Sequence, residues 1–226
     1  MTKGLYCSAA GMLGQLEHQN VLAANLANAS TPGFKRTSVG FMAVYADSVR
    51  TVRVTPLPGN AEAEVVVPVP ITRVDDSQGP VEDTGSPTDV AIVGGGSFCV
   101  QTTQGVRQVR SGAFSLDASG RLITRAGLPV LGRNGPIKIE GPNWTIQPDG
   151  TVTVSGKEVD KIRLQAASGE TVGRLAQGRL EGSNVNPVQE MVAMIAALRA
   201  YEANQRAIVA VDQTLDKVIN QVGKTA

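Results

Sequence analysis

The sequence contains a single histidine, His18, and only two cysteines, Cys7 and Cys99. One imidazole excludes most Ser-His-Asp and Cys-His catalytic sets and any metal site built from several histidines. The two cysteines are far apart, in segments of different character, so they predict neither a disulfide framework nor a metal cluster. We expect both thiols to be small packed residues and His18 to be an exposed residue on a helix.

The chain also lacks an excess of charge of either sign and any long apolar run. Its 226 residues include 21 basic and 20 acidic side chains, which gives a formal net charge of +1. Without a basic cluster, nucleic acid is not an expected partner. No stretch is long enough to span a membrane, and the N-terminus lacks the continuous apolar core of a secretory signal peptide. Taken alone, these absences predict a cytoplasmic protein.

Aromatic residues are scarce, at 4%, whereas glycine is abundant. This balance is typical of short strands and tight turns around a core of Val, Ile and Leu. The glycine-rich segment 94–97 lacks the Gly-Lys-Ser/Thr of a phosphate-binding loop and precedes a β-prone run, so we interpret it as a hairpin turn. The carboxylates are expected in solvated turns and strand ends. The sequence therefore predicts no enzyme, no catalytic or metal-binding residue and no cofactor.

The spacing of residues in the N-terminal segment predicts a helix with one mainly apolar stripe. Its stripe residues follow one another at alternating steps of four and three, as in a coiled-coil seam, and they are Leu5, Ala9, Met12, Leu16, Gln19, Ala23 and Leu26. The stripe is rich in Ala, so it would be marginal as an isolated helix and needs a partner. Pro32 and Gly33 predict that the helix stops near Asn28.

The C-terminal segment predicts a second, longer helix. Asn186 is a good N-cap, and Pro187 suits the first helical position, where its missing N–H is not needed. We expect the helix to run to about Gln221. Its stripe keeps to steps of three and four apart from one seven-residue gap, and it comprises Val188, Met191, Ile195, Leu198, Tyr201, Ile208, Val211, Leu215, Val218 and Val222.

The segment between the helices changes to short β-prone runs separated by turn residues. The expected strands are Asp89 to Val93, Phe98 to Gln101, Phe114 to Leu116, Leu122 to Thr124, Ile137 to Ile139, Thr151 to Val154 and Ile162 to Leu164. This pattern predicts an antiparallel meander, barrel or sandwich. The fold class is therefore α+β. We expect residues 1–34 and 184–226 to be the helical parts of the chain, 35–62 an extended connector that orders on assembly, and 63–183 a β-rich domain.

Motifs near both ends resemble those of the flagellar basal-body rod and hook proteins. Residues 23–35, AANLANASTPGFK, resemble the N-terminal signature of that family, with Asn25, Asn28, Thr31, Gly33 and Phe34 as motif residues. Residues 180–204 resemble its C-terminal signature, with Ser183, Asn184, Val185, Glu190, Arg199 and Glu202. The middle is also similar, at 89–92 and 110–117. Residues 28–34 and 180–186 favour the proximal rod proteins, whereas 194–202 look at least as much like the distal ones.

The resemblance implies a structural subunit that polymerises into the flagellar rod, the helical drive shaft that transmits torque from motor to hook. It implies that residues 1–34 and 184–226 pair as a coiled coil in one discontinuous core domain, and that residues 63–183 form an outer domain. It also implies that both stripes are assembly interfaces. The implied partners are copies of the chain, other rod proteins, hook or rod-surrounding ring proteins, and the flagellar type III export apparatus. The implied location is the periplasmic rod of the basal body, reached without a cleaved signal peptide, which replaces the cytoplasmic prediction.

Two other readings stay open at this point. A secreted coiled-coil adhesin or effector would share the helical ends but would not account for the central motif. A rod-associated peptidoglycan hydrolase would suit a protein that crosses the cell wall, but the lone His18 and the lack of a convincing acid pair argue against it.

Overall fold

The computed structural model describes residues 2–45, 66–166 and 172–222, which form two compact units. We call Met1–Ala27, Thr37–Asp75 and Asn186–Ala226 the helical unit, and Asn28–Arg36 with Asp76–Val185 the β unit. These bounds differ from the expected domains, because residues 28–34 belong to the β unit. The described chain contains two helices and mainly antiparallel strands, which confirms the α+β class. Within these described ranges, neither helix is both long and apolar enough to cross a membrane.

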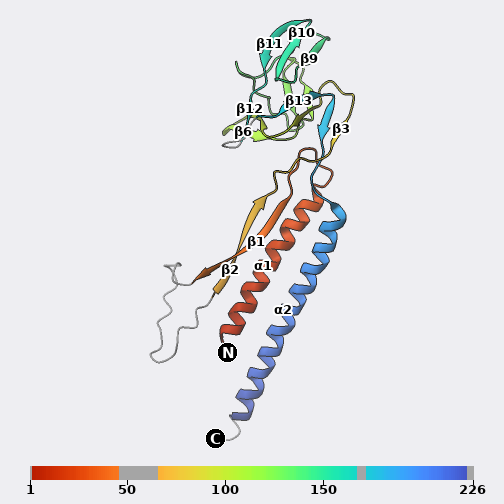
Figure 1. Ribbon diagram of the computed structural model, residues 1–226. Coiled ribbons are helices and arrows are strands. Elements are labelled where there is room, and N and C mark those ends of the chain that lie inside the picture. The colour runs from red at the N-terminus through yellow and green to blue at the C-terminus, as the bar shows by residue number, and fades with distance from the viewer. Residues whose placement is uncertain (1, 46–65, 167–171, 223–226) are drawn as a thin grey trace. The chain divides into compact units, whose positions relative to one another are not determined.

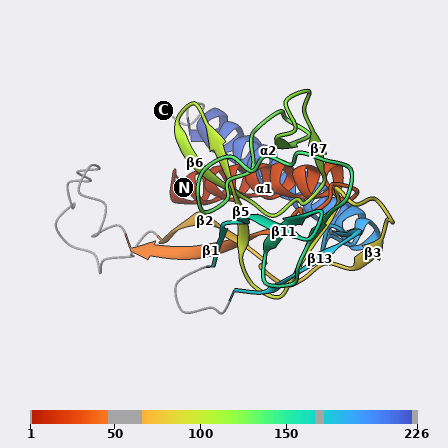
Figure 2. The same cartoon turned by 90° about the horizontal axis from the view of Figure 1, so that it is seen from above.

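The helical unit consists of α1 (Thr2–Ala27), α2 (Pro187–Val222) and a two-stranded sheet. α1 packs along α2, which runs in the opposite direction, and it also contacts the hairpin of β1 and β2 (Figure 1, Figure 2). The expected ends of both helices are confirmed within a residue or so. Asn186 caps α2, since its Oδ1 accepts hydrogen bonds from the N–H groups of Val188 and Gln189 at 3.1 and 3.3 Å.

The expected connector is partly wrong, because residues 37–45 form a strand. β1 (Thr37–Tyr45) pairs antiparallel with β2 (Val66–Val74), in a register that places Thr37 opposite Val74 and Tyr45 opposite Val66. The sequence gives only a weak strand signal here. The partner strand contains prolines, and it is separated from β1 by residues 46–65. The rest of the expected connector, residues 46–62, lies outside the described residues.

The β unit is built from many short antiparallel pairs. Its strands are β3 (Val81–Asp83), β4 (Val90–Val93), β5 (Ser97–Thr102), β6 (Gly105–Val109), β7 (Phe114–Leu116), β8 (Leu122–Thr124), β9 (Trp144–Ile146), β10 (Thr151–Val154), β11 (Lys157–Lys161), β12 (Leu164–Gln165), β13 (Arg174–Gln177) and β14 (Arg179–Glu181). Two sheets are three-stranded, with orders β11-β10-β9 and β12-β5-β6. The other pairs are β13-β4, β14-β3 and β7-β8.

Most of the expected strands are present, with three differences. Residues 137–139 form no strand but contribute one isolated bridge, between Lys138 and Arg121. Residues 162–164 contribute a bridge at Ile162 and the first residue of β12. The segment 94–97 is not a hairpin turn, because β4 pairs with β13 while β5 pairs with β6 and β12. It instead carries the chain from one sheet to another.

The core of the β unit is aliphatic, as the composition predicts. The buried cluster comprises Val90, Ile92, Phe98, Val100, Phe114, Leu122, Val130, Ile137, Ile139, Ile146, Val152, Val154, Ile162 and Leu175. Phe98 and Phe114 meet edge to face, with ring centroids 5.0 Å apart. Short strands from both ends of the unit contribute to this one cluster, so the unit depends on contacts between residues far apart in sequence.

Candidate functional site

The contact between α1 and α2 includes a buried polar pair. The amide of Asn25 donates a hydrogen bond to Glu190 Oε2 at 3.0 Å, and both residues are fully buried. Gly11 faces α2 closely, since a Cβ at this position would lie 3.4 Å from Asn204 Nδ2. Leu22 and Ala197 are buried with them. Small and polar residues therefore take part in the contact between the helices.

The predicted α2 stripe is mainly exposed. The exposed fractions of Val188, Met191, Ile195 and Leu198 are 65%, 45%, 54% and 46%, and neighbouring Val192 is 63% exposed. Tyr201, Ile208 and Val211 are half-buried, and the side chains of Leu215, Val218 and Val222 lie outside the described set. The spacing thus located an apolar stripe that the described residues leave largely uncovered.

The predicted α1 stripe is also partly exposed. Leu16 is 41% exposed and Leu13, which the stripe omitted, is 68% exposed. Ala9 and Ala23 are also exposed, Met12, Gln19 and Leu26 are half-buried, and the side chain of Leu5 lies outside the described set. The residues that do contact α2 lie one position earlier in the repeat, for example Gly11, Leu22 and Asn25. His18 is half-buried, not exposed as expected.

The three family-like motifs meet inside the β unit, at Glu181. This carboxylate is 2% exposed and forms ion pairs with Lys35 Nζ at 2.6 Å and Arg110 Nε at 2.7 Å. The N–H of Gly79 also donates to it, at 3.1 Å. The Arg110 guanidinium donates further hydrogen bonds to the carbonyl oxygens of Ile92, Gly94 and Gly96. We call Lys35, Arg110 and Glu181 the motif junction.

The N-terminal motif forms a turn that brings its backbone to Glu181. Thr31 Oγ1 donates a hydrogen bond to Asn28 Oδ1 at 3.1 Å, and the N–H of Phe34 donates to the carbonyl of Thr31. Gly33 has a φ of 70° and its N–H donates to the carbonyl of Glu181 at 2.7 Å. A Cβ at Gly33 would lie 2.6 Å from the backbone nitrogen of Ser111. Only glycine combines this φ with such a close approach.

The C-terminal motif residues divide between the two units. In the β unit, Asn184 Oδ1 accepts a hydrogen bond from the N–H of Arg36 at 2.6 Å, and Ser183 Oγ accepts one from Val185. In α2, Glu190 is buried, Arg199 is exposed, and Glu202 lies 3.8 Å from Arg206 in an exposed ion pair. The motif thus combines residues with structural contacts and residues on the surface of α2.

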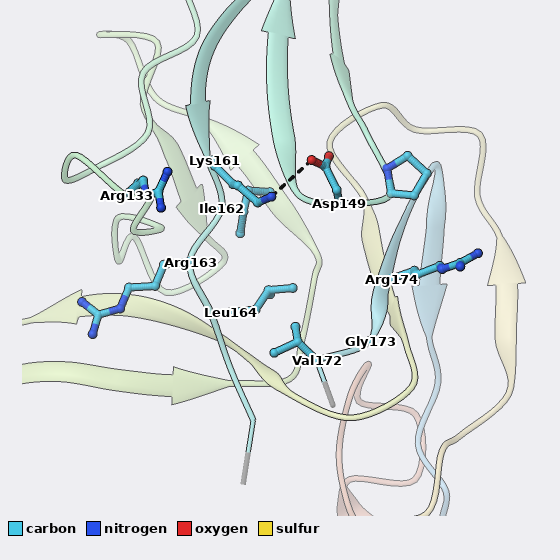
Figure 3. Close-up of a pocket in the computed structure, with 10 residues that line it drawn as sticks. Arg133, Asp149, Lys161, Ile162, Arg163, Leu164, Val172, Gly173 and Arg174 are labelled. Carbon is cyan, nitrogen blue, oxygen red and sulfur yellow. Dashed lines mark hydrogen bonds and ion pairs between the residues drawn. The ribbon is translucent and has the colours of Figure 1, made fainter. Parts of the chain in front are cut away.

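The β unit also has an open cavity of about 850 Å³, lined by Arg133, Pro148, Asp149, Lys161, Ile162, Arg163, Leu164, Val172, Gly173 and Arg174. Lys161 extends toward Asp149, with Nζ and Oδ2 3.2 Å apart, whereas Arg163 and Arg174 point away from this pair (Figure 3). The charged groups therefore do not converge on one point. Cys99 is buried in β5, and burial raises the pKa of its thiol. The described residues contain no cluster of three or more potential metal ligands.

Asp149 predicts a local pH dependence. Hydrogen bonds from the N–H and hydroxyl of Thr151, followed by Lys161, lower its pKa from 3.8 to about 2. A carboxylate with a depressed pKa stabilises the folded state above its unfolded pKa, and this contribution is lost as the pH falls through the folded pKa. We expect the urea midpoint of the protein to exceed that of Asp149→Asn at neutral pH, and the difference to shrink between pH 3.8 and about pH 2. A difference that stays constant over this range would contradict the assignment.

Comparison with known proteins places the chain in one family. Residues 5–35 match the family described as flagella basal body rod protein, residues 91–154 the flagellar hook protein FlgE/F/G D1 domain, and residues 176–222 the flagellar basal body rod FlgEFG protein C-terminal. The chain is 33% identical to FlgG of Buchnera aphidicola subsp. Schizaphis graminum, covering 96% of this chain and 99% of the relative. It is 32% identical to FlgF of Escherichia coli, covering 94% and 95%. It is 28% identical to FlhO of Bacillus subtilis, a flagellar hook-basal body complex protein, covering 99% and 100%. The chain therefore belongs to the flagellar basal-body rod protein family.

Proposed function

We propose that this chain, a structural subunit of the flagellar basal-body rod, polymerises through the apolar faces of its two helices. The observation that carries this proposal is the exposed face of α2, where Val188, Met191, Val192, Ile195 and Leu198 recur at the spacing of successive helical turns. Exposed apolar patches of this kind mark surfaces that are covered by a partner. In the rod, neighbouring copies of the subunit would cover this face.

The terminal helices pair as an antiparallel coiled coil within each subunit. The packing of α1 along α2, the close approach of Gly11 to Asn204 and the buried hydrogen bond of Asn25 support this pairing. Because much of the apolar face of α2 is exposed, the pair is only marginally stable in an isolated chain. Burial of the outer faces against neighbouring copies supplies the remaining folding free energy during assembly.

The polymer is an open helix. A contact that joins two different surfaces of successive copies generates a filament when the rotation does not close into a ring. The helical units form the inner tube, the β units form the outer layer, and the product is a stiff shaft that transmits torque from motor to hook. The other partners are neighbouring rod proteins and hook or ring proteins. The subunits reach the periplasmic part of the basal body through the flagellar type III export apparatus.

The double substitution Ile195→Asp/Leu198→Asp tests this function. Both side chains are about half exposed, so the monomer tolerates the carboxylates, whereas burial of unpaired charges between copies is strongly unfavourable. We expect loss of rod assembly and motility, with an unchanged circular dichroism spectrum of the purified protein. Asp83→Ala/Arg179→Ala, an exposed ion pair in the β unit, is the control and should leave motility intact. Normal flagella in the Asp variant would refute the proposal.

A further inference from the structure

Two contacts between α1 and α2 define a single register. Asn25 contacts Glu190, and Gly11 contacts Asn204, so the contacts lie two heptads apart on each helix and in opposite directions. The heptad positions between them are occupied on α1 by Gln15, His18 and Leu22, and on α2 by Ala193, Ala197 and Ala200. Leu22 and Ala197 are buried, as this alignment requires.

This contact surface specifies its own register poorly. Its α2 side repeats alanine at successive heptad positions, and its α1 side includes Gly11 and Gln15. A slip of one heptad toward the C-terminus of α2 would place Leu22 opposite Ala200 instead of Ala193, so one small partner would replace another. Moreover, Gln15 Oε1 and Gln19 Nε2 are buried without a hydrogen-bond partner among the described residues, so they do not favour the observed register. Hydrogen bonds between residues 33–36 and 181–184 in the β unit tie the chain after α1 to the chain before α2 and limit the slip. A polar contact between the helices themselves adds to this selection.

Asn25 provides the missing specificity. Its Nδ2 donates to the carbonyl of Thr37 at 2.7 Å and to Glu190 Oε2 at 3.0 Å, and its Oδ1 accepts from the N–H of Thr37 at 2.9 Å. The side chain thereby joins α1 to the first residue of β1 and to the first turn of α2. In a slipped register, the buried amide and the buried carboxylate would lose each other, and unpaired buried polar groups are strongly unfavourable.

We propose that Asn25 and Glu190, seated on Thr37, form a register lock that selects one antiparallel alignment of α1 and α2. The lock fixes the position of α2 along the axis of α1, and so sets the height at which the exposed Val188–Leu198 face meets neighbouring copies. The last step rests on the proposed function. The lock itself does not, because it is a property of the individual chain.

Disulfide trapping in the full-length chain tests the lock. Cys7→Ser/Cys99→Ser removes the native thiols. The in-register pair is then Gly11→Cys with Asn204→Cys, and the slipped pairs combine Gly11→Cys with Ala197→Cys or with Val211→Cys, one heptad to either side. After mild oxidation, peptide mass spectrometry measures the yield of each intramolecular disulfide. We expect the in-register yield to exceed each slipped yield about tenfold or more, the effect of one hydrogen bond to a buried charged group.

Asn25→Leu/Glu190→Leu distinguishes a lock from a merely stabilising contact. The variant retains apolar burial, so the helix pair should persist by circular dichroism, while the tenfold preference should fall several-fold. Glu190→Gln keeps an oxygen acceptor and should retain the preference. The exposed control Glu202→Ala/Arg206→Ala should also retain it.

An unchanged preference in the double Leu variant, or no preference in the parent chain, would overturn the proposal. Intact assembly of Ile195→Asp/Leu198→Asp would instead count against the proposed function, and it would leave these disulfide ratios unaffected.

Discussion

Replacing Glu181 by alanine is expected to destabilise the β unit by about 3–5 kcal/mol, the range for removing one partner from a buried ion pair. The substitution leaves Lys35 and Arg110, which are 13% and 11% exposed, without the carboxylate that neutralises them. It also removes the acceptor of the Gly79 N–H. The motif junction holds three segments together that are far apart in sequence, so its loss should loosen all three.

Equilibrium urea unfolding, followed by Trp144 fluorescence, measures this effect. Trp144 is the only tryptophan and packs against the core of the β unit, so its emission reports on that unit alone. The matched control is Asp83→Ala, which breaks an exposed ion pair to Arg179 of similar length, 2.6 Å. Such exposed pairs contribute about 0–1 kcal/mol. Equal effects of the two substitutions would show that the motif junction is not a buried electrostatic contact.

Gly112→Ala is expected to destabilise the same unit by more than about 4 kcal/mol, because overpacking against backbone cannot be relieved by a rotamer change. A Cβ at this position would lie 1.6 Å from the carbonyl oxygen of Val90 and 3.2 Å from the Phe98 ring. The carbonyl of Gly112 accepts a hydrogen bond from the Val90 N–H at 3.0 Å, so the segments cannot separate without losing that bond. The buried core at Val90 would be disrupted.

The same fluorescence assay applies, with Gly127→Ala as the control. Gly127 has a φ of 76°, and a Cβ at this position would have no neighbouring atom within 4 Å. Alanine there therefore meets only backbone strain of about 1–2 kcal/mol. A Gly112→Ala protein that unfolds at the same urea concentration as the Gly127→Ala control would show that Gly112 is not a close-packing position.

Local signals in the sequence predict the helix ends and several strands. Pro187 after Asn186 marks the start of α2, and Pro32 marks the region just beyond the end of α1, since both act through the backbone of adjacent residues. The apolar runs of β4, β5, β7, β8 and β10 are bounded by turn formers, which makes them recognisable without their partners.

Other strands depend on distant partners and leave little local trace. β6 is mostly exposed. β3 pairs with β14, although most of the sequence of the β unit lies between the two strands. The motif junction is similar. Lys35, Arg110 and Glu181 each lie within a family-like motif, but nothing in the order of residues indicates that their side chains meet. Such ion pairs become evident only when the topology is known.

Helical periodicity identified the apolar stripes but not what each face contacts. A stripe at heptad spacing predicts burial against some partner, whether in the same chain or in another copy. The contact within the chain uses Gly11, Leu22, Asn25, Glu190 and Ala197, which are small or polar and carry a weak hydrophobic signal. The stronger signal, at Val188 to Leu198, is exposed, and we assign it to contacts between copies.

A cryo-EM map of isolated basal bodies, with this chain built into the rod, tests the account most directly. We expect Val188, Met191, Ile195 and Leu198 to be buried against helices of adjacent copies, while Asn25 and Glu190 remain paired within each chain. A map in which this face of α2 is exposed to solvent, or in which the chain is absent from the rod, would contradict it.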